Sequence, residues 1–212
     1  MTAAQLVGRY VAIDPFDAER DPPLLWEALG GEAQINERLR WFGWEPMRRL
    51  ADFRVHLDGM AVNDGEAINV FRDLRGAVLG MASYLSTVAE HGVTEVGYVA
   101  HGPAMSRTPA STEAHYLLAQ RAFDTFGYRR YEWKCNAGNL PSRRAAERMG
   151  FVYEGTFRQQ RVARDRNRDT AWFSMTDGEW PACRDAFEAW LSPDNFDPRG
   201  CQKRRLEDLR RA

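Results

Sequence analysis

Residues 93–109 read VTEVGYVAHGPAMSRTP and join a run rich in β-branched residues to the start of a helix. The first eight residues favour a strand. Thr108 and Pro109 fit an N-cap and a first helical residue, since a hydroxyl satisfies a free helix N–H and proline has none to lose. Free N–H groups and the positive helix dipole predict an anion site here, beside the cation of Arg107. The alternative is a plain connection between strand and helix.

A second stretch, residues 139–155, reads NLPSRRAAERMGFVYEG. Its helical pattern begins at Asn139 and stops at Gly150, because glycine readily takes the left-handed conformation that ends many helices. Between the two stretches we expect a helix over 108–126 and a strand over 131–135.

The rest of the chain alternates the same two patterns. An Asn63-Asp64-Gly65 turn signal separates an N-terminal helical region from the strands that follow. Further strands are expected at 8–14, 67–71, 77–85, 151–162 and 169–175, with a turn at 164–168; further helices are expected from Asp21, in two pieces over 35–57, and at 179–191. This order indicates an α+β or α/β fold with a mixed sheet.

Composition narrows the class of protein. The 212 residues are 44% hydrophobic and 28% charged, which predicts one domain over residues 1–192 and a short charged extension over 193–212. The net charge of -1 gives no field that would draw the chain to nucleic acid or to a membrane. Three cysteines without CxxC spacing favour free thiols. With no signal-peptide pattern and no long apolar run, the expected location is cytoplasmic.

Four stretches of the chain resemble the GNAT N-acetyltransferases, in particular their ribosomal-protein N-terminal acetyltransferase (RimJ/RimL-type) branch. Residues 95–98 (EVGY) resemble the family's central strand, 112–114 (TEA) the start of its cofactor helix, and 126–135 (FGYRRYEWKC) the following strand. Residues 139–155 match its N-x-x-S…A-x-R-x-G-F…E-G signature. The resemblance implies an α+β, GNAT-type α/β sandwich with a mixed, mostly antiparallel sheet and helices on both faces.

The resemblance also implies an acetyl-CoA site. The central strand and its neighbour would splay apart around the pantetheine arm, and the pyrophosphate would lie on the loop that leads into the 108–126 helix. The cofactor-binding residues that follow from this are Tyr98, Val99, Ser106, Arg107, Thr108, Ala110, Ser111, Thr112 and Asn139.

The phosphate loop departs from the family's Q/R-x-x-G-x-G/A pattern. Arg107, Thr108, Pro109 and Ala110 stand where glycines let the backbone approach the phosphates. Pro109 also lacks an N–H, so Arg107 and the hydroxyls of Thr108 and Ser111 are the expected substitutes. The departure concerns cofactor affinity rather than the fold.

Two residues are candidates for catalysis. Ser142 would protonate the departing CoA thiolate, although a serine at a helix start is also a common structural choice. Glu95 would act as the general base for the attacking amine, although a lone strand glutamate is more often solvated. The family's second candidate base, just after the E-G pair, corresponds here to Arg161, which cannot accept a proton.

Other features keep two interpretations each. Cys135 is a buried strand residue or a redox-sensitive thiol, and the four histidines show no metal-ligand spacing, so no metal is expected. The basic segment 158–168 is a solvated hairpin or attracts an acidic peptide or the cofactor phosphates. The aromatic residues at 41, 42 and 44 belong to an acceptor pocket or to the core.

The resemblance implies direct acetyl transfer to a primary amine, in a ternary complex without a covalent enzyme intermediate. The acceptor is a protein N-terminus or a small molecule, and a homodimer is left open. The alternative function is a non-catalytic acyl-CoA-binding module.

Overall fold

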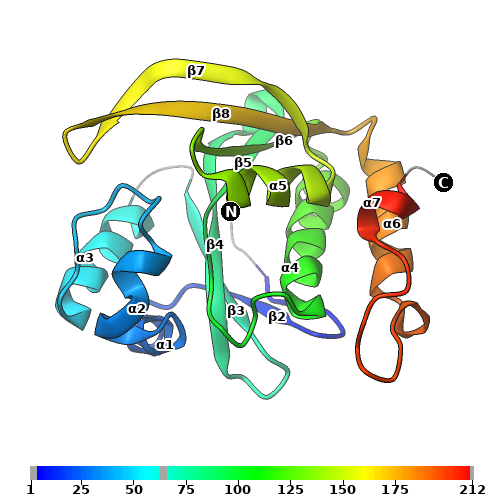
Figure 1. Ribbon diagram of the computed structural model, residues 1–212, viewed down its shortest axis with the longest axis horizontal. Helices are drawn as coiled ribbons and strands as arrows, with labels where there is room; N and C mark the ends of the chain where they lie inside the picture. The colour runs from blue at the N-terminus through cyan, green and yellow to red at the C-terminus, as the bar shows by residue number, and fades with distance from the viewer. Residues whose placement is uncertain (1–3, 63–65, 211–212) are drawn as a thin grey trace.

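One eight-stranded sheet organises the chain, in the order β1-β2-β3-β4-β5-β6-β8-β7. The computed structural model describes residues 4–62 and 66–210. Every neighbouring pair in the sheet is antiparallel except β5 and β6, which are parallel. Helices α1 to α3 lie on one face and α4 on the other (Figure 1). The mixed, mostly antiparallel sheet between helices confirms the predicted GNAT-type α+β fold.

The elements have the following bounds. The strands are β1 (Leu6–Val7), β2 (Ala12–Pro15), β3 (Ala67–Arg72), β4 (Val78–Val88), β5 (Val93–His101), β6 (Arg130–Asn136), β7 (Val152–Ala163) and β8 (Arg166–Thr176). The helices are α1 (Asp21–Ala28), α2 (Gly31–Arg38), α3 (Leu50–Ala61), α4 (Pro109–Gln120), α5 (Leu140–Met149), α6 (Trp180–Leu191) and α7 (Leu206–Leu209). A π-helical turn, Arg121–Thr125, extends α4.

Strand alternation places the core on both faces of the sheet. Val70 and Met81 pack with α1, α2 and α3, whereas their neighbours Phe71 and Ala82 pack with α4 and α6. Successive strand residues point to opposite faces, so two adjacent residues of one strand enter two different cores. Both faces of β3 and β4 are therefore covered by helices.

The predicted strand over 8–14 is wrong in its first half. Residues 8–11 form a turn between β1 and β2, because the buried carboxylate of Glu113 on α4 accepts the backbone N–H groups of Arg9 (2.8 Å), Tyr10 (2.6 Å) and Val11 (3.0 Å). N–H groups bound to a carboxylate are lost to a strand ladder. A Cβ on Gly8 would lie 2.4 Å from the Glu113 carboxyl carbon, so glycine fits this turn.

The hairpin turn expected over 164–168 is shorter in the structure. Arg164 and Asp165 alone form the connection, with φ of 49° and 56°, and β8 already begins at Arg166. Two successive left-handed residues give the type of turn that matches the twist of paired strands. The β7–β8 hairpin is consequently long, and it arches across the top of the view toward α1, α2 and α3 (Figure 1). The Asn63–Gly65 turn signal lies outside the described residues.

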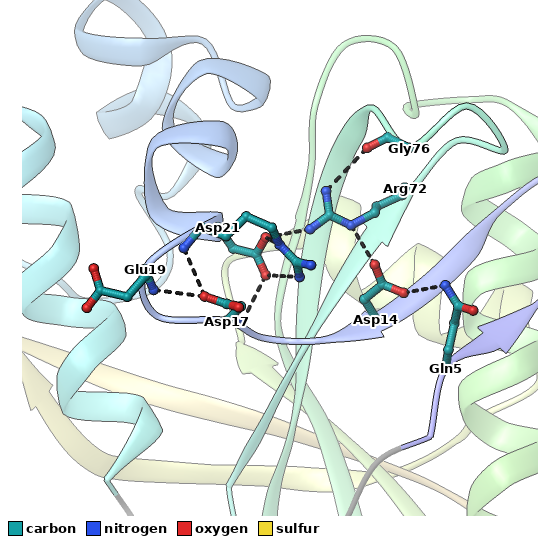
Figure 2. A network of polar contacts seen from close by, with 8 residues as sticks. Gln5, Asp14, Asp17, Glu19, Asp21, Arg72 and Gly76 are labelled. Carbon is teal, nitrogen blue, oxygen red and sulfur yellow. Dashed lines mark hydrogen bonds and ion pairs between the residues drawn. The ribbon is translucent and has the colours of Figure 1, made fainter.

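A buried ion-pair network attaches α1 to β2 and β3. Figure 2 shows Arg72 between the carboxylates of Asp14, whose oxygen lies 2.6 Å from the guanidinium, and Asp21. Asp21 is fully buried and also accepts hydrogen bonds from Arg20 and the Asp17 N–H. Burial raises the pKa of Asp21, but the hydrogen bonds and the Arg72 charge outweigh burial and lower that pKa.

The C-terminal segment packs against the helices before it. Leu206 of α7 is fully buried in the core that contains α4 and α6. The Arg210 guanidinium donates to the carbonyl groups of Glu147 (2.9 Å) and Arg148 at the end of α5. Within residues 4–62 and 66–210, no helix combines the length and the apolar character that crossing a bilayer requires.

Candidate active site

The two parallel strands separate in the middle of the sheet. β5 and β6 pair from Val93 and Arg130 as far as Val96 and Trp133, and no pairing between them is present beyond that point in the described chain, although both strands continue. β6 stays paired with β8 on its other side, to Asn136 and Thr170. The β6-facing edge of β5 is therefore left without a strand partner.

A β-bulge in β5 accompanies the separation. Ser83 of β4 faces Gly97, but Met81 faces Ala100, so two residues, Tyr98 and Val99, stand opposite Ala82. Tyr98 has a φ of 46°, a left-handed conformation that is uncommon for a large side chain. A bulge bends its strand and increases the local twist, which turns the end of β5 away from β6.

The separation opens a cavity of about 940 Å³. Its walls come from β5, β6, the N-terminal half of α4, α5 and the β7–β8 hairpin. From the roles expected from the sequence, the part of the cavity at α4 and α5 is called the cofactor end, and the part under the hairpin is called the acceptor end.

The N-terminus of α4 faces the cofactor end. Thr108 is the extended N-cap, and Pro109 is the first helical residue, as the sequence predicted. The hydroxyls of Ser106, Thr108 and Ser111 each donate to a nearby backbone carbonyl, at 3.0, 2.7 and 2.7 Å. Pro109 has no N–H, and the N–H groups of Thr108 and Ser111 each donate to a backbone carbonyl at 3.2 Å. Among residues 108–111, the backbone donor that remains for an anion is therefore the N–H of Ala110. The hydroxyl oxygens can only accept.

Two arginines flank this helix start. Arg107 is exposed, has a φ of 63° and lines the cavity. Arg148 of α5 lines it too, with its Nη1 3.1 Å from the Thr112 hydroxyl and its guanidinium 5.0 Å from the centre of the Trp190 ring. Arg148 was not among the predicted site residues, although it stands inside the A-x-R-x-G-F string that was recognised. Both cations favour an anionic ligand here.

Ser142 sits between α5 and β6. Asn139 caps α5 by accepting the Ser142 N–H at 3.2 Å, and the Trp133 indole N–H donates to the Ser142 hydroxyl at 2.9 Å. Because Ser142 Oγ accepts from Trp133, its own hydrogen points elsewhere, and the Cys135 thiol is one acceptor within its reach. Burial raises the pKa of the neighbouring Cys135 thiol, and a hydrogen bond from Ser142 opposes that rise. Cys135 is a free thiol and is buried, which agrees with its interpretation as a buried strand residue.

Glu95 lies on β5 just before β5 and β6 separate, and it is the first residue of a row of ionised side chains. Its carboxylate is 2.9 Å from Lys134, which is also 2.8 Å from Glu132 and 4.0 Å from the centre of the Trp172 ring. Burial raises the pKa of Glu95, and the charge of Lys134 acts in the opposite direction. Glu95 is buried, not solvated. A buried carboxylate with a raised pKa is suited to accept a proton near neutral pH.

A pair of buried histidines lines the cavity between the two ends. The rings of His101 and His115 are 5.6 Å apart, and His115 lies 5.2 Å from the Trp133 ring. Burial lowers the pKa of His101 to about 4 and that of His115 to about 3. Both rings are therefore neutral near pH 7 and hold an added proton poorly. In the described part of the chain, no three His, Cys, Asp or Glu side chains gather as a metal site.

The acceptor end is roofed by the hairpin. The Arg164 guanidinium at the hairpin tip donates to the Trp44 carbonyl at 2.7 Å, and a Cβ on Gly43 would lie 3.6 Å from the Cβ of Ala163. Beneath this contact, the Phe42 ring packs 5.0 Å from Trp44 and 5.3 Å from Tyr98. Phe42 both packs against its aromatic neighbours and lines the cavity, and Trp41 lines it too.

Residues 11–152 match the acetyltransferase (GNAT) domain family. The chain belongs to this GNAT family. A GCN5-related N-acetyltransferase from Brucella melitensis is 43% identical over 99% of this chain and 95% of its own, with a TM-score of 0.93. A probable GNAT acetyltransferase from Chromobacterium violaceum is 37% identical over 84% of this chain and 88% of its own, with a TM-score of 0.79.

More distant GNAT structures share the fold alone. A protein from Vibrio cholerae, described as a candidate ribosomal-protein-serine acetyltransferase, is 16% identical over 82% of this chain and 97% of its own, with a TM-score of 0.67. Comparison with curated proteins found no match. The family uses acetyl-CoA to acetylate amines of proteins or of small molecules.

Most of the predicted site residues border the GNAT cavity. Those that line it are Glu95, Tyr98, Val99, Arg107, Thr108, Ser111, Thr112, Asn139 and Ser142. Ser106 and Ala110 are absent from its lining, because Ser106 bonds back to Gly102 and Ala110 is buried under the helix start. Sequence patterns missed Arg148, His115 and Lys134, which reach the cavity through tertiary packing, whereas Arg168 belongs to the basic segment that the sequence singled out.

The two buried histidines predict how stability depends on pH. Their folded-state pKa values lie below the usual value near 6.5, so between pH 6.5 and about 4 the unfolded chain binds more protons and stability falls as pH falls. Each contributes a slope of about 1.4 kcal/mol per pH unit at most. We expect His115→Gln to remove about half of this slope, measured by urea unfolding at pH 6.5 and pH 4.5. An unchanged slope would contradict the neutral, buried pair.

Proposed function

We propose that this chain transfers the acetyl group of acetyl-CoA directly to the primary amine of a small molecule. The observation that carries the proposal is the separation of β5 from β6, which opens between a helix N-terminus on one side and Glu95 and Ser142 on the other. An anion site and two proton-transfer groups along one cavity suit a thioester donor that is joined to a pyrophosphate.

The cofactor end supplies the binding groups. Beyond Val96, the backbone of β5 near Tyr98 and Val99 offers donors and acceptors to the pantetheine amides as a neighbouring strand would. The Ala110 N–H and the positive end of the α4 dipole attract the pyrophosphate, and Arg107 and Arg148 replace the glycine-rich loop as its positive partners.

The chemistry divides between the two sides of the cavity. Glu95 accepts the proton of the incoming ammonium, and the free amine attacks the thioester carbonyl carbon. The C–S bond then breaks, the Ser142 hydroxyl donates its proton to the CoA thiolate, and the surplus proton of the newly bonded nitrogen replaces it on Ser142 Oγ. The indole N–H of Trp133 stabilises the negative charge that develops on Ser142 Oγ.

The roof of the acceptor end favours a small acceptor. The RimJ/RimL resemblance allows a protein N-terminus, whose following residues need an open groove. The contact of Arg164 with Trp44 instead closes the hairpin tip onto the α2–α3 connection. A small amine loses less conformational entropy than a polypeptide when it enters such a pocket.

The proposal is tested with acetyl-CoA and a panel of small amines. We expect free CoA thiol to appear only when both substrates are present, and the melting temperature to rise with acetyl-CoA concentration because the ligand binds the native state alone. A shift without thiol release would support a non-catalytic acyl-CoA-binding module. Neither signal at millimolar acetyl-CoA would contradict the cofactor assignment.

The two arginines at the cofactor end make a second prediction. Arg148→Ala and Arg107→Ala are each expected to weaken acetyl-CoA binding by about 10-fold or more, the range of one charge-assisted hydrogen bond. Calorimetry measures the Kd. Arg144→Ala is the matched control, because this exposed arginine of α5 does not line the cavity. Equal affinities for all four proteins would remove both arginines from the phosphate site.

Ser142→Ala separates general-acid help from a structural role. As proton donor to the thiolate, Ser142 acts only in the transition state, so kcat and kcat/KM are expected to fall together by about 10²-fold while the Kd of acetyl-CoA stays nearly constant. If its hydroxyl only satisfies the Trp133 indole, the variant loses about 1 kcal/mol of stability and keeps its turnover per folded molecule. Melting temperature and turnover of one preparation distinguish the two.

Glu95→Gln is the contrasting variant, because Glu95 acts on the amine. Wild-type kcat/KM is expected to fall as pH drops through the raised pKa of Glu95. Glu95→Gln is expected to be slower at every pH and to lose this decrease of kcat/KM at low pH. Ser142→Ala is expected to keep the decrease.

A further inference from the structure

Two arginines face each other across the β7–β8 hairpin and line the acceptor end. Arg161 of β7 stands directly opposite Arg168 of β8, and both border the cavity. The pairing register shifts between Phe157 and Arg161, where Gln159 has a φ of 53°. This bulge lies immediately before the arginine pair, and a bulge re-aims the side chains beside it.

The pair has no ion-pair partner within the described chain, and Arg161 is exposed whereas Arg168 is half-buried. Neither Arg161 nor Arg168 forms an ion pair with any described carboxylate. Glu95, the carboxylate that acts on Arg168, is already paired with Lys134. Like charges directly opposite each other destabilise a sheet. An arrangement that lowers stability and faces a cavity points to an anionic ligand.

Buried polar atoms without partners give a second, independent observation. Arg168 Nε, Trp172 Nε1 and one carboxylate oxygen of Glu66 are buried and make no hydrogen bond within the described residues. All three residues line the same cavity. His101 Nε2 and His115 Nδ1, elsewhere on the cavity wall, are also buried without a partner. Buried polar groups are nearly always satisfied, so the set at the hairpin suits a ligand that accepts from two donors and donates to one carboxylate.

The arginine pair is distinct from the phosphate site. Arg168 interacts electrostatically with Arg161, Cys135, Glu95 and Tyr98, so it lies between the hairpin and the middle of the cavity. Arg148, at the cofactor end, instead interacts with Glu207 and Arg210 on the C-terminal segment. The cofactor phosphates already have the α4 N-terminus, and two unpaired guanidinium groups beside Glu95 disfavour a polycationic acceptor.

We propose that the acceptor is a small amine that also carries a carboxylate, as an amino acid does. Arg161 and Arg168 bind the carboxylate, with the Trp172 indole N–H as a third donor. Glu66 attracts the ammonium group before Glu95 takes its proton. The aromatic side chains of Trp41 and Phe42 at this end favour an apolar substituent. This inference rests on the proposed acetyl transfer.

The test compares amino acids with matched amines that lack the carboxylate. Phenylalanine, phenylalaninamide and phenethylamine, and the corresponding tryptophan series, are assayed for CoA thiol release. We expect kcat/KM for the amino acid to exceed that of its neutral counterparts by roughly 10- to 100-fold. Arg161→Gln and Arg168→Gln are each expected to remove this preference, mainly through KM.

Arg158→Gln is the matched control, because this arginine of the same hairpin is exposed and does not line the cavity. It is expected to keep the wild-type preference. The Arg161 and Arg168 variants are also expected to melt no lower than the wild type without ligand, since each relieves a like-charge contact. A clear loss of melting temperature would instead assign the pair a structural role and overturn the proposal.

Other outcomes contradict the proposal directly. Equal rates for amino acids and decarboxylated amines would exclude a carboxylate site. The same conclusion would follow if the Arg161 and Arg168 variants changed only the Kd of acetyl-CoA. Acetylation confined to acidic peptide N-termini would replace the small acceptor with a polypeptide. If no amine releases thiol, acetyl transfer fails, but calorimetry of amino acid against amine, with CoA present, still tests the carboxylate site.

Discussion

The loss of pairing between β5 and β6 is the constraint on which the site depends. A strand whose edge is not paired must satisfy its N–H and C=O groups in another way. Here the bulge at Tyr98 and Val99 turns β5 away from β6 while β4 still holds it on the other side. The open edge therefore has a fixed position. The separation supplies both a cavity and a row of oriented backbone groups along it.

The groups around this cavity are held by contacts that also stabilise the fold. Asn139 caps α5, and the same helix start positions Ser142 against the Trp133 indole. The α4 carboxylate of Glu113 fixes the turn before β2, so the helix whose N-terminus faces the cofactor end is tied to the edge of the sheet. The functional groups consequently rest on regular elements, which limits their movement during catalysis.

Charge is distributed along the cavity in three separate sets. Arginines on α5 and before α4 stand at the cofactor end, and a chain of alternating charges runs from Glu95 through Lys134 to Glu132 near the middle. The unpaired arginines of the hairpin stand at the acceptor end. The middle set holds one cation between two carboxylates, whereas each outer set consists of arginines. This distribution fits the proposed anionic groups at both ends of the cavity, with proton transfer between them.

The sequence by itself determined what depends on near neighbours. The start of α4 at Pro109 and the end of α5 at Gly150 were predictable because capping and helix termination involve residues three or four positions apart. Strand alternation likewise placed most of the sheet. Only the tertiary structure decided the rest: Arg164 meets Trp44 across 120 positions, and Glu113 interrupts the first strand from 104 positions away. Such contacts depend on the bulges and turns that set the direction of each strand. A pattern of neighbouring residues does not specify that direction.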